Sequence, residues 1–353
     1  MKRNLAIAVC LLLISLSSLA LAQLPIPSLS APVTNNAVAL LRKHTGAVMF
    51  TFMGMGAKKS WDAITNTAFT LGPTDDKWYP IAPVPGTAGR IASSAIAARG
   101  AVFVFGGYVM DSQQHAMATP DVNVYQPSGN RWLRGADIPI AVGDSAIGLY
   151  RDRYIYLLGG RSNHGAIPNV QIYDSERSNW FPGTPMPGTA VFGHAGAIVE
   201  DTIIFVDGAY VSGSGSQAAY ATSDQCWLGK IDRHDPGKIE WSRLPPHPGP
   251  TRYRIAAGGS AKDQRVYFSG GSAQPYGTLG LGPDGKPLEP SADTFAFNLQ
   301  TKKWETLAKN PRPTMDHRGL LVTSDGLVVI GGMGKNAEVT NRIAFLSKQI
   351  KNP

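Results

Sequence analysis

The sequence predicts an all-β chain built from repeated four-stranded sheets. Glycine and proline are abundant, with 39 and 26 copies among 353 residues, whereas charged residues make up only 16% of the chain. Short apolar alternations, such as "AVFVF" at 101–105, stop at a pair of glycines, and no helical periodicity persists beyond the first residues. These features are typical of chains with many short strands and tight turns. The same phrase recurs along the chain, which predicts a six-bladed β-propeller.

The repeat can be followed from the point where each apolar strand ends. Six such points occur, at Gly54, Gly106, Gly159, Asp207, Gly270 and Gly331. Their spacing runs from the high forties to the low sixties, which is the period of four-stranded propeller blades. A glycine here lets the backbone turn sharply where a Cβ would clash. The first and fourth copies are weaker, because neither carries the glycine pair.

The other strands of each unit follow the same logic. A strand rich in Ala, Gly and Ser precedes the apolar one, as in "IASSAIAA" at 91–98, and we expect it to lie near the crowded axis. After a variable loop, an apolar residue stands seven positions before a tryptophan. The pairs are Leu71 and Trp78, Tyr125 and Trp132, Tyr173 and Trp180, and Phe297 and Trp304. We expect these repeat residues to pack the blades rather than to bind a ligand.

The glycine pair, the aromatic-to-tryptophan spacing and the period together resemble kelch repeats. The resemblance covers essentially the whole chain after residue 22 and implies one domain, a kelch β-propeller over 23–353. The last unit lacks a tryptophan strand, while "LPIPSLSAP" at 24–32 is similar to the "LPPHPGP" that follows Trp241. We therefore expect the N-terminal segment to supply the outer strand of the last blade and so close the ring.

The first 22 residues read as a secretory signal peptide. Lys2 and Arg3 precede a short apolar run, and small residues lead to a cleavage site after Ala22. We expect the remaining chain to be exported to the periplasm or the extracellular space, without stable membrane insertion. Its basic residues are scattered, so no nucleic-acid partner is predicted. Cys226 is the one cysteine after the signal, and we expect it to be a buried, unreactive thiol, although a reactive odd cysteine is the alternative.

Polar residues at the starts of the predicted inner strands form the candidate binding site, because propeller loops converge there. The candidates are Arg90, Asp144, His194, Arg254, Asp316 and His317, with Arg318 beside the last, and Tyr210 in a long insertion at 209–225. Together they could form a pocket for hydroxyls or for a carboxylate. They could instead satisfy backbone groups between blades or face water in the channel. A second insertion, at 272–293, follows the fifth glycine point.

Signals for metals, cofactors and nucleophiles are weak. His234 and Asp235 are adjacent, so their side chains diverge, and no second cluster has ligand spacing. No G-x-S-x-G motif is present. A copper radical site of the galactose oxidase type needs a cysteine crosslinked to a tyrosine, together with tyrosine and histidine ligands, and the segment around Cys226 does not fit such a site. We therefore expect no metal and no cofactor.

Size, signal, six units and "FGHAGAIV" at 192–199 resemble the bacterial N-acetylneuraminate epimerases, the sialic acid mutarotases. That resemblance implies a periplasmic enzyme that exchanges sugar anomers with acid and base help. The family's proposed catalytic Glu falls on Ala209 here, and no arginine follows before Arg233. The catalytic pair therefore does not carry over to this chain.

Three hypotheses remain open on the sequence alone. The first is an exported propeller that binds a carbohydrate or another small or anionic ligand at the channel mouth, with no demonstrable catalysis. The second is a sugar mutarotase that uses another acid and base pair, such as His194 with His317 or Asp144. The third is a protein-interaction scaffold, because propeller loops present broad surfaces.

Overall fold

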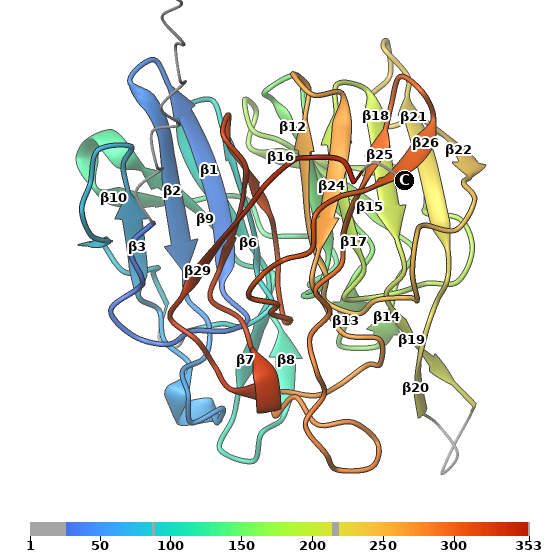
Figure 1. Cartoon of the computed structure of the whole chain (residues 1–353). Coiled ribbons are helices and arrows are strands. Elements are labelled where there is room, and N and C mark those ends of the chain that lie inside the picture. Colours follow the sequence, from blue (N-terminus) through green and yellow to red (C-terminus); the bar gives the residue numbers. More distant parts are fainter. Residues whose placement is uncertain (1–25, 87–88, 214–218, 352–353) are drawn as a thin grey trace, which may run out of the picture.

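The chain folds into six antiparallel sheets around a central axis (Figure 1), as predicted. This computed structural model describes residues 26–86, 89–213 and 219–351. The expected signal peptide, 1–22, lies outside these residues. Within the described ranges no helix is long and apolar enough to cross a membrane.

Five blades have four strands each, ordered from the axis outwards. Blade one contains β1 (Ala37–Lys43), β2 (Gly46–Phe52), β3 (Ala68–Leu71) and β4 (Tyr79–Ile81). Blade two contains β5 (Ser94–Ala98), β6 (Ala101–Phe105), β9 (Val122–Gln126) and β10 (Arg131–Arg134). Blade three contains β11 (Ala146–Tyr150), β12 (Tyr154–Leu158), β15 (Val170–Asp174) and β16 (Asn179–Gly183). Blade four contains β17 (Ala195–Val199), β18 (Thr202–Val206), β21 (Cys226–Ile231) and β22 (Ile239–Arg243). Blade five contains β23 (Ala256–Ser260), β24 (Arg265–Ser269), β25 (Thr294–Asn298) and β26 (Lys303–Thr306). Blade six has three strands among the described residues, β27 (Leu321–Val322), β28 (Leu327–Ile330) and β29 (Ile343–Leu346).

The two faces of the propeller differ in their connections. Three extra hairpins project from one face, at the bottom of Figure 1. They are β7 (Tyr108–Met110) with β8 (Ala116–Ala118), β13 (Arg161–Ser162) with β14 (Gly165–Ala166), and β19 (Ala209–Ser212) with β20 (Ala219–Thr222). Two of the short 3-10 helices, η1 (Trp61–Ala63) and η4 (Lys335–Ala337), lie in connections of the same face, whereas η2 (Pro127–Gly129) joins β9 to β10. We call this side the loop face, and the opposite side, where short turns join the first two strands of each blade, the turn face.

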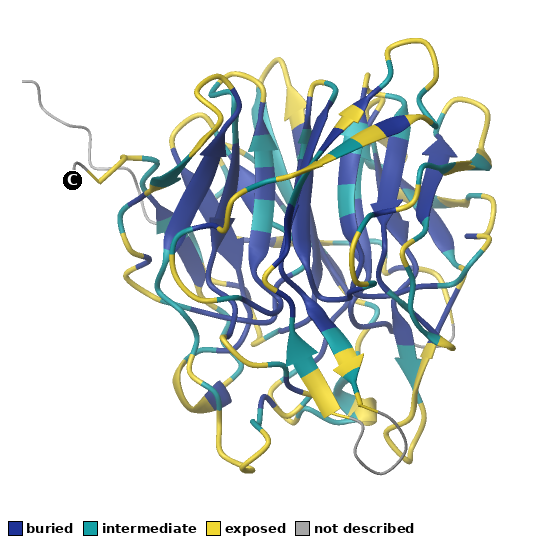
Figure 2. Ribbon diagram, turned by 90° about the vertical axis from the view of Figure 1, so that its right-hand side faces the viewer, coloured by how far each residue is buried: buried dark blue, intermediate teal, exposed yellow. Residues whose placement is uncertain are grey.

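Most strand residues are buried (Figure 2), and their apolar and aromatic side chains hold the blades together. Phe105 of blade two, for example, meets Trp180 of blade three edge to face, with 5.7 Å between ring centroids. The repeat tryptophans also donate their indole N–H to a carbonyl of the preceding blade. Trp132 donates to Ala82 at 2.8 Å and Trp180 to Ala136 at 2.9 Å. Each tryptophan thus fixes two blades, which is the structural role that its spacing predicted.

The N-terminal segment closes the ring, although it does not form the expected strand. Trp78 of blade one donates to the Pro27 carbonyl at 2.8 Å, so this segment takes the place of a preceding blade. Leu29 exchanges hydrogen bonds with Asn341, just before β29, and packs in the apolar cluster shared by blades one and six. Residues 26–33 nevertheless have no strand structure. Proline lacks the N–H that a sheet ladder requires, and Pro27 and Pro32 interrupt this segment.

Candidate ligand-binding channel

One residue of each blade, just before the inner strand, has a left-handed backbone with φ between 53° and 75°. These ring residues are Asn35, Ala92, Asp144, Gly193, Arg254 and Asp316. Backbone hydrogen bonds join them from blade to blade. The N–H of Asp144 donates to Ala92, and the N–H of Gly193 to Asp144, at 3.0 and 2.9 Å. The repeat therefore places six side-chain positions in a ring at the loop-face end of the axis.

Charged side chains of this ring pair with one another. Arg254 donates to Asp316 Oδ1 at 2.9 Å and to Asp144 Oδ2 at 3.0 Å. Arg318, from blade six, lies 2.7 Å from Asp144 Oδ1. Blades three and six face each other across a six-bladed ring, so the contact between Asp144 and Arg318 crosses the axis. We call Asp144, Arg254, Asp316 and Arg318 the ionic plug, because they close the channel at this end.

The plug is buried, and its charges balance. Its four side chains are at most 8% exposed. Burial raises the pKa of Asp144, but the charges of Arg254 and Arg318 outweigh it, so the pKa lies below its ordinary value. On the loop side, the Arg254 guanidinium lies over the rings of Tyr253 and Tyr276, at 4.9 and 5.3 Å. Tyr276 belongs to the insertion at 272–293, which therefore covers the plug.

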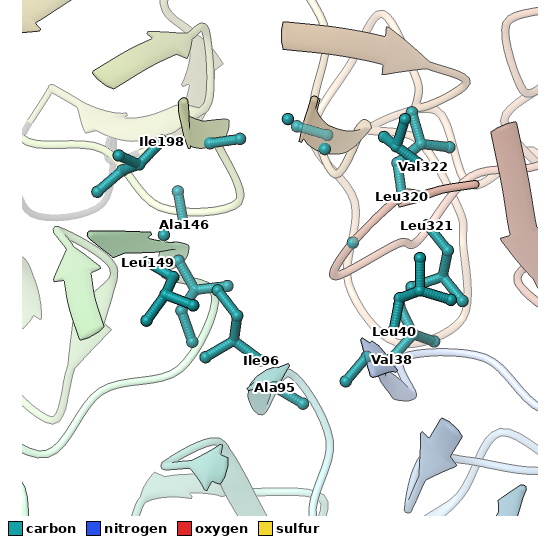
Figure 3. Close-up of a pocket in the computed structure, with 18 of the residues that line it drawn as sticks. Val38, Leu40, Ala95, Ile96, Ala146, Leu149, Ile198, Leu320, Leu321 and Val322 are labelled. Carbon is teal, nitrogen blue, oxygen red and sulfur yellow. The ribbon is translucent and has the colours of Figure 1, made fainter. Parts of the chain in front are cut away.

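A channel of about 480 Å³ extends from the plug toward the turn face. Inner strands of all six blades line it, and the apolar side chains of its wall surround an open centre in Figure 3. The labelled wall residues include Val38, Leu40, Ile96, Leu149 and Ile198. At the turn face the lining ends in exposed charged residues, namely Arg42, Arg99, Asp152 and Glu200. The middle of the channel wall is thus rich in apolar side chains, between a polar, charged floor and a charged rim.

Comparisons with known proteins agree with this architecture. No family model matches the chain. Kelch-like protein 15 of Mus musculus is 24% identical over 258 residues, which cover 69% of this chain and 38% of that protein. The solved structure of YjhT is 16% identical, with a TM-score of 0.70 over 93% of this chain and 99% of that one. The chain is a kelch-type β-propeller.

This kelch propeller also resembles N-acetylneuraminate epimerase 1 of Escherichia coli O6:H1. The two are 22% identical over 320 residues, which cover 79% of this chain and 82% of the epimerase. At Ala209, where the resemblance places a catalytic Glu, the side chain is fully buried and pairs through its backbone with Phe192. Ala209 therefore offers no acid at the position where the resemblance places one.

The kelch propeller brings together only part of the predicted site. Asp144, Arg254 and Asp316 meet in the plug. His194 and His317 stand one residue after the ring, and their rings lie between blades, His194 against Phe205 and His317 with Nε2 at 2.9 Å from Thr314 Oγ1. Burial lowers the pKa of both histidines to about 4. They are therefore neutral at pH 7.

Arg90 and Tyr210 lie away from the plug. Arg90 stands two residues before the ring, where it pairs with Asp121 at 3.3 Å and donates to Asn123 at 2.6 Å. Blade five repeats this pattern with Arg252 and Asp293, so the position supports the third strand. The half-buried Tyr210 packs against the apolar cluster between blades three and four. Ligand binding by any of these residues stays a prediction.

Arg318 was among the polar candidates on the sequence, but its pairing across the axis and the contacts of Asn35 were not predicted. Arg318 stands where the other inner strands carry a small residue, namely Ala37, Ser94, Ala146, Ala195 or Ala256. Asn35 is the ring residue of blade one, and its side-chain amide both accepts from Arg318 and donates to Asp316. An arginine in a column of alanines was the available signal, and aligning the inner strands by residue would have exposed it.

Proposed function

We propose that this kelch propeller binds a small, largely apolar molecule in its channel, with an oxygen acceptor of that molecule at the plug. The observation that carries the proposal is the floor of the channel. Arg318 lines the cavity, and its Nε atom has no hydrogen-bond partner among the described residues. A buried donor without a partner is costly, and a ligand oxygen that displaces the side chains covering Nε would satisfy it. The volume of about 480 Å³ falls in the range of small-molecule sites.

The walls favour an apolar body over a bare sugar. Val38, Leu40, Ile96 and Leu149 offer no hydrogen-bond partner to ring hydroxyls, whereas they would bury hydrocarbon well. Arg318 and Asp144 line the floor, and the four plug charges cancel, so the floor suits an uncharged acceptor such as a carbonyl oxygen. An aliphatic or aromatic carbonyl compound therefore fits both the floor and the apolar part of the wall. N-acetylneuraminate, named by one relative, is the polar comparison ligand.

The proposal does not include catalysis. Asp144 is held in ion pairs, and His194 and His317 are buried between blades. The exposed carboxylates of Asp152 and Glu200 lie at the far rim. Asp144, His194 and His317 line the floor end of the channel, but Asp144 is engaged by two arginines and both histidines are buried and neutral at pH 7, which favours binding over acid and base catalysis.

A pair of matched variants tests where ligands bind. Leu149→Trp narrows the channel, whereas Leu133→Trp makes the same change on the outer strand β10, where Leu133 is exposed. We expect calorimetry with a panel of aliphatic and aromatic carbonyl compounds and N-acetylneuraminate to give binding that Leu149→Trp weakens at least about tenfold and Leu133→Trp leaves unchanged. Binding that ignores Leu149→Trp, or no binding across the panel, would overturn the channel site. Proton NMR of N-acetylneuraminate with the same proteins should show no faster anomer exchange than buffer, and acceleration lost in Leu149→Trp would make the channel an active site.

Protein docking at the loop face is a second candidate function. Large apolar side chains are exposed on its projections, at Trp61, Met117, Val211, Tyr220 and Leu279. Apolar side chains gathered on one face are typical of interaction surfaces. The substitutions Met117→Ser and Val211→Ser should each lower the affinity of a protein partner for this face at least about tenfold, because central apolar contacts dominate such interfaces. A partner unaffected by both changes binds elsewhere.

A further inference from the structure

Asp207, Cys226 and His247 form a buried cluster outside the channel. Asp207 directly follows β18, Cys226 begins β21, and His247 lies in the segment that leads from blade four to blade five. The cluster offers one carboxylate oxygen, one Sγ and one imidazole nitrogen, and these three atoms all lie within 4.8 Å of one another. The three residues are at most 7% exposed.

The imidazole of His247 is oriented for ligation. Its Nδ1 lies 2.9 Å from the carbonyl oxygen of Pro248, which can only accept, so Nδ1 carries a hydrogen. Nε2 therefore points to the Asp207 carboxylate, at 2.8 Å from Oδ2. Phe295 stacks on the ring, with 4.4 Å between centroids, and fixes its plane. A backbone carbonyl that holds the second nitrogen is the usual arrangement around a metal-bound histidine.

One of the two carboxylate oxygens of Asp207 lacks a hydrogen-bond partner among the described residues. Oδ2 accepts from the Arg252 N–H at 2.7 Å as well as from His247. Oδ1 has no hydrogen-bond partner in the described part of the chain, although the residue is fully buried. A carboxylate oxygen in this situation is destabilising unless something positive approaches it.

We propose that Asp207, Cys226 and His247 bind a divalent cation of the zinc class. Thiolate, imidazole and carboxylate are the ligand types that zinc takes, and three protein ligands leave one position for water. Without the cation, the thiol keeps its proton and one proton lies between Nε2 and Oδ2. Zinc replaces these two protons, and its two positive charges are balanced by the thiolate of Cys226 and the carboxylate of Asp207. The cluster is therefore neutral with or without the metal, as a buried position requires.

The ligands come from three separate segments, 19 and 21 residues apart. Short metal motifs place ligands within a few residues, so sequence reasoning did not predict this cluster and took Cys226 as an inert thiol. The cluster joins β18, β21 and the connection to blade five. Bound zinc would therefore brace the irregular fourth blade, and this role is independent of the channel.

Metal titration of the full chain tests the proposal. We expect one zinc per chain to survive desalting, and Co²⁺ to give the charge-transfer absorption of a cobalt thiolate. Cys226→Ser and His247→Gln should each weaken zinc binding by at least about tenfold, and Cys226→Ser should abolish the absorption. His234→Gln is the matched control, because His234 is an exposed histidine beside Asp232 and Asp235 and should leave both signals unchanged.

A second measurement covers the case in which a variant does not fold. In the unaltered protein, zinc should slow alkylation of Cys226 by iodoacetamide at least about tenfold when urea is added to the point where the chain opens transiently, because Cys226 is buried in the folded chain and bound thiolate is withheld from the reagent. If His234→Gln loses the bound zinc and Cys226→Ser retains it, the metal binds at the surface and the proposal is overturned. Absence of both the cobalt band and the protection would overturn it outright.

Discussion

The two ends of the central channel carry the same kinds of charged residue in opposite surroundings. At the loop face, Asp144, Arg254, Asp316 and Arg318 pair across the axis and are buried. At the turn face, Arg42, Arg99, Asp152 and Glu200 stand exposed around the opening. The difference follows from the repeat, because the ring before the inner strands is covered by long loops, whereas the opposite ends meet only short turns.

This contrast shows how one propeller can have a closed and an open end. A buried charge persists only if a partner offsets its desolvation, so the loop-face charges must neutralise one another. Charges in water carry no such requirement, and the rim can remain wide. Pairing across the axis is thus what closes the channel, and the open rim is its entrance.

Breaking the plug should have the largest effect. Arg254→Met keeps a long side chain but removes the cation between Asp144 and Asp316, which leaves two buried carboxylates with Arg318 alone. We expect the free energy of unfolding to fall by about 3–5 kcal/mol, because a buried pair has lost one partner. Urea denaturation at pH 7 measures the change.

The control removes an arginine charge at the turn-face end of the channel. Arg99→Gln neutralises an exposed rim residue, and we expect the free energy of unfolding to change by no more than about 0.5 kcal/mol. Equal losses for the two variants would show that the ends do not differ in burial, and a loss below about 1 kcal/mol for Arg254→Met would show that the plug is not paired.

A histidine beside the ring should give the plug end its own pH dependence. Burial lowers the pKa of His194 to about 4, below the value of about 6.5 in an unfolded chain. Between pH 7 and 5 the unfolded chain gains a proton that the folded chain does not, so stability falls as the pH falls. This term is about 2 kcal/mol over that interval. Blade three carries Ser145 at the position equivalent to His194, so serine fits there. We expect His194→Ser to remove the part of the fall in the free energy of unfolding between pH 7 and pH 5 that comes from this histidine.

The comparison of urea unfolding at pH 7 and pH 5 decides the matter. A drop in stability that is as steep in His194→Ser as in the original chain would mean that the imidazole takes up a proton in the folded state. The ring would then face water in the channel rather than lie between blades three and four.

The fold could be predicted from sequence because the same pattern of strands and turns recurs in each of the six repeats. Glycine pairs mark the end of the second strand in four of the six units, tryptophans mark the outer strand in most of them, and the N-terminal segment was correctly expected to close the ring, although it forms no strand. The site was harder for a geometric reason. Asp144 is itself a ring residue, whereas His194 stands one residue after the ring, and a shift of one residue along an extended chain turns a side chain to another side. Asp144, Arg254 and Asp316 therefore meet Arg318 at the axis, while His194 packs against Phe205 and Arg90 pairs with Asp121.

The smallest expected effect tests whether the loop-face end is dry. The Tyr276 ring covers Arg254, and its buried hydroxyl has no hydrogen-bond partner in the described ranges. Tyr276→Phe removes an unpaired polar group and keeps the ring. We expect the free energy of unfolding to rise by between zero and about 1 kcal/mol. A fall of more than about 1 kcal/mol would mean that this hydroxyl has a partner such as water, and a wet cover over the plug would leave both ends of the channel open to solvent.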